Sequence, residues 1–495
     1  MAIDKSTLEE ESLDPEDWEA MRALGHQMVD DMLDHLKTIR QQPAWRHAPE
    51  RVKAHFREKL PLEPQPVEEV YQEFLEFILP YPVGNTHPRF WGWLFGTGTV
   101  TGAFAEFLAA VMNTNAGDLD HHAANHVEKQ VLDWLKELLG FPAEASGLLT
   151  SGCSAANLIG LAVARNAKAG FDVRRKGLIA APRKMILYAS EQIHSSVQKS
   201  VELLGLGGDS IRYLGVDDDF RMDVRALKTA IDRDLEKGYQ PFCVVGAAGT
   251  TNTGATDDLN ALADVCQAYN LWLHIDAAFG AWAALAPEIR DQVAGMERAN
   301  SLAFDLHKWM YMPYEIGCVL VRDEQIHRRA FSLTPAYLES VGDGRGLTGG
   351  DLPWLTDLGY QLSREFRALK AWMSLKEHGL HKYERLIRQN IEQAQYLAEL
   401  VTTADELELA APVPLNVVCF RYAPAGLREL DLDALNKGIL VELQESGVAV
   451  PSGTTLRGRY VLRVGITNHR SRSEDFKVLV EAVIRIGRRL AAEIP

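Results

Sequence analysis

Short β-rich runs alternate with helical patterns from about residue 85 to residue 370, and this alternation constrains the fold more than any other feature. Apolar runs of strand length occur at Lys184–Tyr188, Cys243–Ala247, Leu271–Ile275 and Gly317–Val321. Strands that alternate with helices form βαβ units around a mostly parallel sheet with helices on both faces. The sequence therefore predicts an α/β fold in which a ligand binds beyond the carboxyl ends of the strands.

The segments on either side of this region have different patterns. Residues 1–84 indicate helices broken by prolines, with a helix start expected at Asp14-Pro15. Apolar side chains recur there at helical spacing, at Met21, Leu24, Met28, Met32 and Leu36. An arm of this kind cannot bury its apolar face alone, so we expect it to pack on the rest of the chain or on a partner subunit.

From residue 371 onward the pattern becomes a helix pair, then strands around Val417–Tyr422 and Tyr460–Val464, then a closing helix from Ser473. At 495 residues the chain is long enough for two or three domains. We expect a helical arm over 1–84, a large ligand-binding domain over 85–370 and a small α+β domain over 371–495.

The composition is that of a globular enzyme and excludes several classes of function. Hydrophobic residues make up 46% of the chain and charged residues 24%. The net charge of −16 argues against a nucleic-acid partner, which would need a basic face. The sequence has no signal-peptide core and no run of roughly 18 apolar residues that would span a membrane. Because the five scattered cysteines suit neither a disulfide framework nor a zinc site, we expect a cytoplasmic protein without a bound metal.

A carboxylate and a lysine follow two successive apolar segments. Asp276 ends the Leu271–Ile275 run, and Lys308 lies 32 residues later, in Asp305-Leu306-His307-Lys308-Trp309. A lysine amine can form a Schiff base with pyridoxal phosphate (PLP), and an acid near the pyridine nitrogen keeps it protonated so that the ring acts as an electron sink. Either residue alone fits a half-buried lysine or a capping aspartate, but together they predict a PLP site.

Three polar turns follow other predicted strands. Leu148–Asn157 passes through small residues into a helix expected over Leu158–Ala167, and the N–H groups there, with the Ser154 hydroxyl, suit a phosphate. His194 and Thr251 follow two further strands. Each fits a plain turn or a helix cap when it is taken alone. Their weight comes from their combination with the aspartate and the lysine.

This set of residues resembles the group II PLP-dependent amino-acid decarboxylases, which include the aromatic-L-amino-acid, glutamate, cysteine-sulfinate and histidine decarboxylases. The resemblance runs from the helical arm through His87-Pro88-Arg89-Phe90 to the strand of Arg463, and it is closest in pattern to aromatic-L-amino-acid decarboxylase. It rests most on His307-Lys308-Trp309 with Asp276-Ala277-Ala278 upstream. The resemblance implies PLP fold type I (aspartate aminotransferase-like), a homodimer with active sites at the subunit interface, and decarboxylation of an L-amino acid.

The resemblance also implies a role for each residue of the site. Lys308 would bind PLP covalently and Asp276 would pair with the pyridine nitrogen. His194 and Ala278 would lie against opposite faces of the ring. The phosphate and the ring substituents would be contacted by a second group, namely Cys153 (through its backbone N–H), Ser154, His307 and Thr251.

Two positions bear on how this sequence would differ from its relatives. Family members often have Asn-Pro before the His-Lys pair, where this chain has Asp305-Leu306. A carboxylate near a phosphate would be repelled unless it is turned away or hydrogen-bonded elsewhere, so Asp305 is not expected to bind the phosphate. Tyr337 matches the family's mobile loop, and a glycine-rich stretch over 342–350 suits a flexible lid. Tyr337 would protonate the substrate carbon after CO2 leaves, although it also fits a surface tyrosine in a turn.

The segment that would line the substrate pocket, Asn85–Thr97, favours an aromatic side chain. Trp93 stands at about the position where glutamate- and sulfinate-specific relatives carry Gln, and Phe95 extends the apolar wall. Such a wall would leave a side-chain carboxylate unpaired. Arg463 could hold a carboxylate or pair structurally. A polar neighbourhood argues the other way, at Asn113, Asn115, His121 and His122.

Several alternatives remain open from the sequence. The substrate could be an acidic amino acid such as glutamate, aspartate or cysteine sulfinate. An aromatic aldehyde synthase is disfavoured by His194 and by Tyr337, because family members with Phe in place of Tyr337 tend to be aldehyde synthases. An aminotransferase or a PLP-binding protein without activity would also have this fold, but the latter is expected to have lost a catalytic group.

Overall fold

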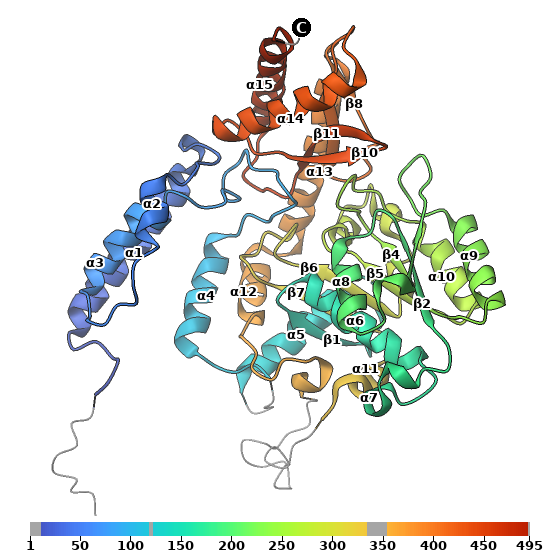
Figure 1. The fold of residues 1–495 in the computed structure, drawn as a ribbon. Coiled ribbons are helices and arrows are strands. Elements are labelled where there is room, and N and C mark those ends of the chain that lie inside the picture. The colour runs from blue at the N-terminus through green and yellow to red at the C-terminus, as the bar shows by residue number, and fades with distance from the viewer. Residues whose placement is uncertain (1–10, 118–121, 334–353, 494–495) are drawn as a thin grey trace, which may run out of the picture. The chain divides into compact units, whose positions relative to one another are not determined.

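The computed structural model describes residues 11–117, 122–333 and 354–493. The chain forms two compact units (Figure 1). The smaller contains residues 1–42 and 46–82, and the larger contains residues 43–45 and 83–495. The predicted domain boundaries after residues 84 and 370 stay predictions.

The smaller unit is helical, as the proline-broken pattern predicted. Helix α1 (Trp18–Thr38) is followed by α2 (Glu50–His55), α3 (Val67–Glu73) and a π-helical turn over Phe74–Ile78. The first helix begins at Trp18 rather than at Pro15, because Asp17 is the residue whose side chain accepts the N–H groups of the first turn. Within the apolar stripe, Leu24 is buried.

The larger unit is built on a seven-stranded sheet with strand order β1-β7-β6-β5-β4-β2-β3. Every neighbouring pair is parallel except those that involve β7, which runs antiparallel to both β1 and β6. This confirms the predicted mostly parallel α/β sheet. The strands are β1 (Ser146–Thr150), β2 (Met185–Ser190), β3 (Ile211–Leu214), β4 (Gln240–Ala247), β5 (Trp272–Asp276), β6 (Ser301–Asp305) and β7 (Gly317–Val321).

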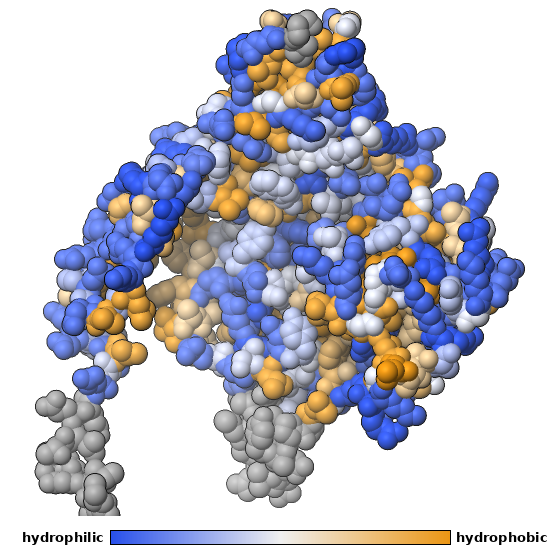
Figure 2. Space-filling view, viewed as in Figure 1, coloured by the Kyte–Doolittle hydropathy of each residue, from blue (hydrophilic) through white to orange (hydrophobic). Residues whose placement is uncertain are grey.

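Helices cover both faces of this sheet, so its strands are apolar on both sides. Along β2, Leu187 packs with one core and Tyr188 with the other. One face is covered by α6 (Cys153–Lys168), α8 (Ser195–Leu203) and α11 (Glu324–Phe331). The other is covered by α5 (Ala123–Leu138), α9 (Val224–Glu236) and α10 (Leu259–Ala268). Hydrophilic side chains dominate the outer side of α9 and α10 (Figure 2). Two further helices are α4 (Val100–Met112) and α7 (Val173–Lys176).

The last part of the larger unit carries a four-stranded antiparallel sheet with strand order β10-β11-β9-β8. Its strands are β8 (Leu407–Leu409), β9 (Val417–Tyr422), β10 (Ser452–Leu456) and β11 (Arg459–Gly465). Its helices are α12 (Ala368–His378), α13 (Leu380–Thr402), α14 (Glu429–Glu445) and α15 (Ser473–Ala491). The predicted strand at Val417–Tyr422 and the closing helix from Ser473 are therefore present.

Among the described residues, no helix is both long enough and apolar enough to cross a membrane. All five cysteines are buried and carry free thiols. Within the same part of the chain, His, Cys, Asp and Glu side chains form no group of three or more that could hold a metal ion.

Candidate active site

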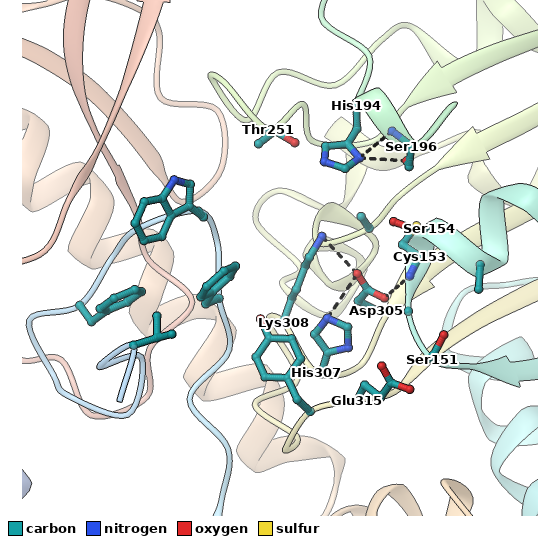
Figure 3. A pocket seen from close by; sticks show the side chains of 18 of the residues that line it. Ser151, Cys153, Ser154, His194, Ser196, Thr251, Asp305, His307, Lys308 and Glu315 are labelled. Atoms are coloured by element: carbon teal, nitrogen blue, oxygen red, sulfur yellow. Dashed lines mark hydrogen bonds and ion pairs between the residues drawn. The ribbon is translucent and has the colours of Figure 1, made fainter. Parts of the chain in front are cut away.

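A pocket of about 1000 Å³ lies at the carboxyl ends of the parallel strands (Figure 3). Strand β1 runs parallel to β6, because both are antiparallel to β7. The chain therefore delivers Ser151 after β1, His194 after β2, Thr251 after β4, Asp276 at the end of β5 and Asp305 at the end of β6 to one edge of the sheet. This is the edge where open α/β sheets bind ligands.

Asp276 is held by donors on both of its carboxylate oxygens. Oδ1 accepts the backbone N–H of Ala278 at 3.1 Å and the thiol of Cys153 at 3.4 Å. Oδ2 accepts the side-chain amide of Asn157 at 2.9 Å. The carboxylate is nearly buried, so these bonds fix its orientation at the base of the pocket.

Lys308 reaches the same pocket from the turn that follows β6 (Figure 3). Its Nζ lies 3.1 Å from Oδ2 of Asp305. Burial alone would lower the pKa of Lys308, but the nearby charges of Asp305 and Asp276 outweigh it and raise this pKa. The Lys308 amine therefore carries a positive charge that the carboxylates of Asp305 and Asp276 stabilise.

Asp305 lies in the pocket rather than turned away from it, because two neighbours compensate its charge. Besides contacting Lys308, it accepts the backbone N–H of Cys153 on Oδ1 at 2.6 Å. Cys153 is the first residue of α6, so the carboxylate lies at the positive end of that helix dipole. The Cys153 N–H that was predicted to hold a phosphate is thus engaged by Asp305 in this structure.

Gly317, the first residue of β7, makes this close approach possible. A Cβ atom there would lie 2.6 Å from the Gly152 Cα and 2.7 Å from Oδ1 of Asp305. Such distances are too short for any side chain. Glycine at this position therefore lets the β7 strand pass beneath the turn that starts α6.

His194 caps α8 and lies on the opposite side of the pocket from Lys308 (Figure 3). Its Nδ1 lies 2.9 Å from the Ser196 hydroxyl and 3.2 Å from the Ser196 backbone nitrogen. Burial lowers the pKa of His194, which favours the neutral imidazole. Thr251 and Ala278 also line the pocket, so the structure gathers the predicted cofactor-binding residues around it.

Aromatic rings form one wall of the pocket. Ring centroids lie 6.1 Å apart for Phe90 and Trp93, 5.7 Å for Trp93 and Phe95, and 5.9 Å for Phe95 and Tyr314. Trp93 has a positive φ of 52° and is 50% exposed, an unusual conformation for a bulky residue. At Gly96 a Cβ atom would overlap the His307 carbonyl oxygen, so glycine lets this wall approach the lysine turn.

Some predicted residues lie elsewhere. Arg463 does not line the pocket; it is buried and donates to the Ser452 hydroxyl at 3.0 Å and to the Thr251 carbonyl oxygen. Arg463 therefore pairs structurally and supports the Thr251 turn. Asn113 and Asn115 line a separate surface hollow. Tyr337 and His121 lie outside the described residues, and His122 is not part of the pocket lining.

The structure adds residues that sequence reasoning missed. Asn157 donates to Asp276, and Ser196 contacts both Asn157 and His194. Tyr314 and Glu315 line the pocket itself. A polar residue within the apolar run of residues 155–164 was the available signal for Asn157. Tyr314 and Glu315 gave no comparable signal, because they lie in an irregular segment after the lysine.

The residues present fit PLP. The Lys308 amine, the Asp276 carboxylate and the His194 ring line one cavity of about 1000 Å³. The Ser154 hydroxyl lines this cavity at the amino end of α6 and is available to an anionic group, whereas the Cys153 N–H beside it is engaged by Asp305. This cavity therefore contains a residue that could bind PLP covalently, one that could keep its pyridine nitrogen protonated and one that could contact its phosphate.

Comparison with known proteins gives a consistent result. Residues 49–423 match the pyridoxal-dependent decarboxylase conserved domain. An aromatic-L-amino-acid decarboxylase from Bacillus atrophaeus is 33% identical over 96% of this chain and 97% of its own. A phenylacetaldehyde synthase from Arabidopsis thaliana is 30% identical over 95% of this chain and 97% of its own. The crystal structure of Oryza sativa TDC with PLP and tryptamine has a TM-score of 0.89 at 26% identity, over 97% of this chain and all of that one.

Proposed function

The chain belongs to the pyridoxal-dependent decarboxylase family, and on this premise we propose that it removes CO2 from an aromatic L-amino acid and releases the amine. The aromatic wall of the pocket carries this choice of substrate. Phe90, Trp93, Phe95 and Tyr314 offer ring faces and edges to an aromatic side chain, whose burial against them is favourable.

An acidic substrate fits this pocket less well. Among the described lining residues, Lys308 is the sole lysine or arginine, and we assign it to the cofactor. Three carboxylates already line the cavity, namely Asp276, Asp305 and Glu315. A side-chain carboxylate would meet repulsion without a cation to compensate it, which disfavours glutamate, aspartate and cysteine sulfinate.

Bound PLP supplies the electron sink that stabilises negative charge on the substrate carbon when CO2 leaves. Lys308 would hold the cofactor covalently. Asp276, fixed by its three donors, would keep a proton on the pyridine nitrogen, because an anion within hydrogen-bond reach favours the charged form. His194 and Ala278 would flank the ring. Ser154 and His307 would contact the phosphate near the start of α6, joined by Cys153 once its N–H leaves Asp305, and Thr251 would lie near the ring substituents.

Tyr337 delivers a proton to the substrate carbon after CO2 has left, and it acts in the neighbouring subunit's site. A positioned phenol protonates the carbon before oxygen reaches it, so the product is the amine. The competing function is aldehyde synthesis, and the similarity to the Arabidopsis phenylacetaldehyde synthase is the observation that favours it. Tyr337 favours the amine, because family members with Phe at this position tend to make aldehyde.

The active protein is a homodimer with its sites at the interface. This proposal is supported by an apolar face on α4, where Phe107 is 64%, Val111 69% and Met112 56% exposed. An exposed apolar face of this kind fits a second copy of the chain. Light scattering should give the mass of two chains, and Val111→Lys should weaken association while Ile179→Lys, at another exposed apolar site, should not. An active wild-type monomer would refute the proposal.

We assign the helical arm of residues 1–84 to the partner subunit's surface, and place the large and small domains at 85–370 and 371–495. The five free, buried cysteines suit a reducing compartment, which supports a cytoplasmic location. Fractionation of the source cells would test that location directly.

The substrate is tested by a panel assay of CO2 release. Phenylalanine, tyrosine, tryptophan, dopa and 5-hydroxytryptophan should react with higher kcat/KM than glutamate, aspartate or cysteine sulfinate. Trp93→Gln should lower kcat/KM for the best aromatic substrate by roughly tenfold, because one wall of the pocket loses its ring. Trp372→Gln, remote from the pocket on α12, is the matched control. Preferred turnover of an acidic amino acid would overturn the assignment.

A further inference from the structure

We propose that Asn157 is a positioning residue that joins Asp276 to His194 in one directed hydrogen-bond chain, and that this chain and the Ser196 backbone N–H together keep the proton of His194 on Nε2. The inference rests on the proposed places of Asp276 and His194 beside the cofactor. Asn157 itself is fully buried on α6 and acts through these two side chains.

The contacts of Asn157 reach both sides of the pocket base. Its Nδ2 lies 2.9 Å from Oδ2 of Asp276 and 3.0 Å from the Ser196 hydroxyl. Its Oδ1 lies 2.9 Å from Nε2 of His274. All four side chains are buried, so water does not compete for these bonds and each donor must meet an acceptor.

The Asp276 end of the chain fixes the orientation of the amide. An ionised carboxylate only accepts hydrogen bonds, so the NH2 group of Asn157 must face Asp276. The carbonyl oxygen then faces His274, which must donate from Nε2. Rotating the amide by half a turn would place two oxygens against each other at 2.9 Å.

The opposite end of the chain is compatible with this direction. Because Nε2 of a neutral His274 donates to Asn157, its Nδ1 must accept, and the Ser301 hydroxyl lies 2.8 Å from it and can give its proton there. The Ser301 oxygen meanwhile accepts the indole N–H of Trp272 at 2.8 Å. His274 keeps its single proton on Nε2, in agreement with a pKa that burial lowers to about 4.

The direction then passes to His194 through Ser196. The Ser196 backbone N–H can only donate, and it points to Nδ1 of His194 at 3.2 Å, so this nitrogen is an acceptor. The Ser196 hydroxyl accepts from Asn157 at 3.0 Å and gives its own proton to the same Nδ1 at 2.9 Å. Nδ1 thus accepts, and a neutral His194 carries its proton on Nε2, at the ring edge away from Ser196 (Figure 3).

Helix α6 packs against His274 at Gly160, about one turn after Asn157, and the missing side chain there leaves room for the imidazole. A Cβ atom at Gly160 would lie 2.6 Å from Cε1 of His274 and 3.3 Å from the Ser301 hydroxyl oxygen. Alanine there would raise helix propensity but would displace His274. The absence of a side chain at this position is therefore a condition for the imidazole to reach Asn157.

A neutron crystal structure of the cofactor-loaded protein tests the direction without any variant. We expect hydrogen on Nε2 of both His194 and His274, none on either Nδ1, and the Asn157 NH2 group toward Asp276. Hydrogen on Nδ1 of His194 would overturn the inference. A cofactor bound away from Asp276 and His194 would instead overturn the proposed site, while the protons of the chain could still be read.

A variant pair tests whether the chain serves the cofactor or only the fold. Asn157→Ala should raise the dissociation constant for PLP, measured by titration of the apoprotein, by about tenfold or more, because Asp276 loses a charge-assisted hydrogen bond. Asn436→Ala removes an equally buried asparagine that bonds the Tyr422 backbone, and should change this constant less than twofold. If both variants lose a similar amount of melting temperature and bind PLP with the same dissociation constant, Asn157 supports only the fold and does not position the cofactor site. If Asn157→Ala does not fold, the neutron structure decides.

Discussion

Replacing Glu128 by alanine should destabilise the protein strongly, because it would leave a buried guanidinium without its partner. Arg364 donates to Glu128 at 2.6 Å, and both side chains are almost completely buried. Glu128 also accepts the Leu149 N–H at 3.0 Å, and Arg364 donates to the Leu149 carbonyl at 2.9 Å. The pair therefore anchors the end of β1 that leads into the pocket.

The expected loss is about 3–5 kcal/mol in the free energy of unfolding, the usual cost of removing one partner of a buried ion pair. Urea unfolding followed by tryptophan fluorescence would measure it. Glu137→Ala, on the exposed side of the same helix, should change the free energy by less than about 0.5 kcal/mol. Replacing Glu128 and Arg364 together by apolar residues should restore part of the loss, because no charge stays buried. Equal effects of Glu128→Ala and Glu137→Ala would refute the reasoning.

Three further outcomes are expected. Asp276→Ala should keep the fold but lose activity by several orders of magnitude, and near-normal turnover would count against its role. Tyr337→Phe should divert product from amine toward aldehyde, ammonia and peroxide; an unchanged rate of amine formation would show that Tyr337 is not the proton donor. The melting temperature should fall as the pH drops from about 6.5 toward 4. His274 and His327 are buried with pKa values lowered to about 4, whereas the unfolded chain takes up these protons near pH 6.5. Each histidine thus contributes up to about 3 kcal/mol to the free energy of unfolding, which is fully present above about pH 6.5 and lost below about pH 4. A melting temperature that does not change over this pH range would contradict the prediction.

The sequence was sufficient to predict the edge of the sheet that carries the site. Asp276 and Asp305 end β5 and β6, and His194 and Thr251 follow β2 and β4, because hydrophobic runs and their polar ends are local features of a sequence. The reversed direction of β7 was not predictable in this way. A buried strand has the same apolar pattern whichever way it runs.

Contacts between distant segments account for what the sequence could not show. Asp305 was not expected to bind the phosphate, but the sequence could not show that its carboxylate lies in the pocket with the Cys153 N–H and Lys308 compensating its charge. Asn157 was a helix residue without an assigned function until the fold placed it between Asp276 and Ser196. Such roles depend on three-dimensional neighbours that come from separate strands and helices.

Attachment of the cofactor to Lys308 is the central claim, and chemical trapping tests it most directly. The PLP-loaded protein would be reduced with borohydride, digested and mapped by mass spectrometry. The label should be found on the peptide that contains Lys308, and Lys308→Ala should bind no reducible cofactor. Label on another lysine, or unchanged labelling of the Lys308→Ala protein, would contradict the account.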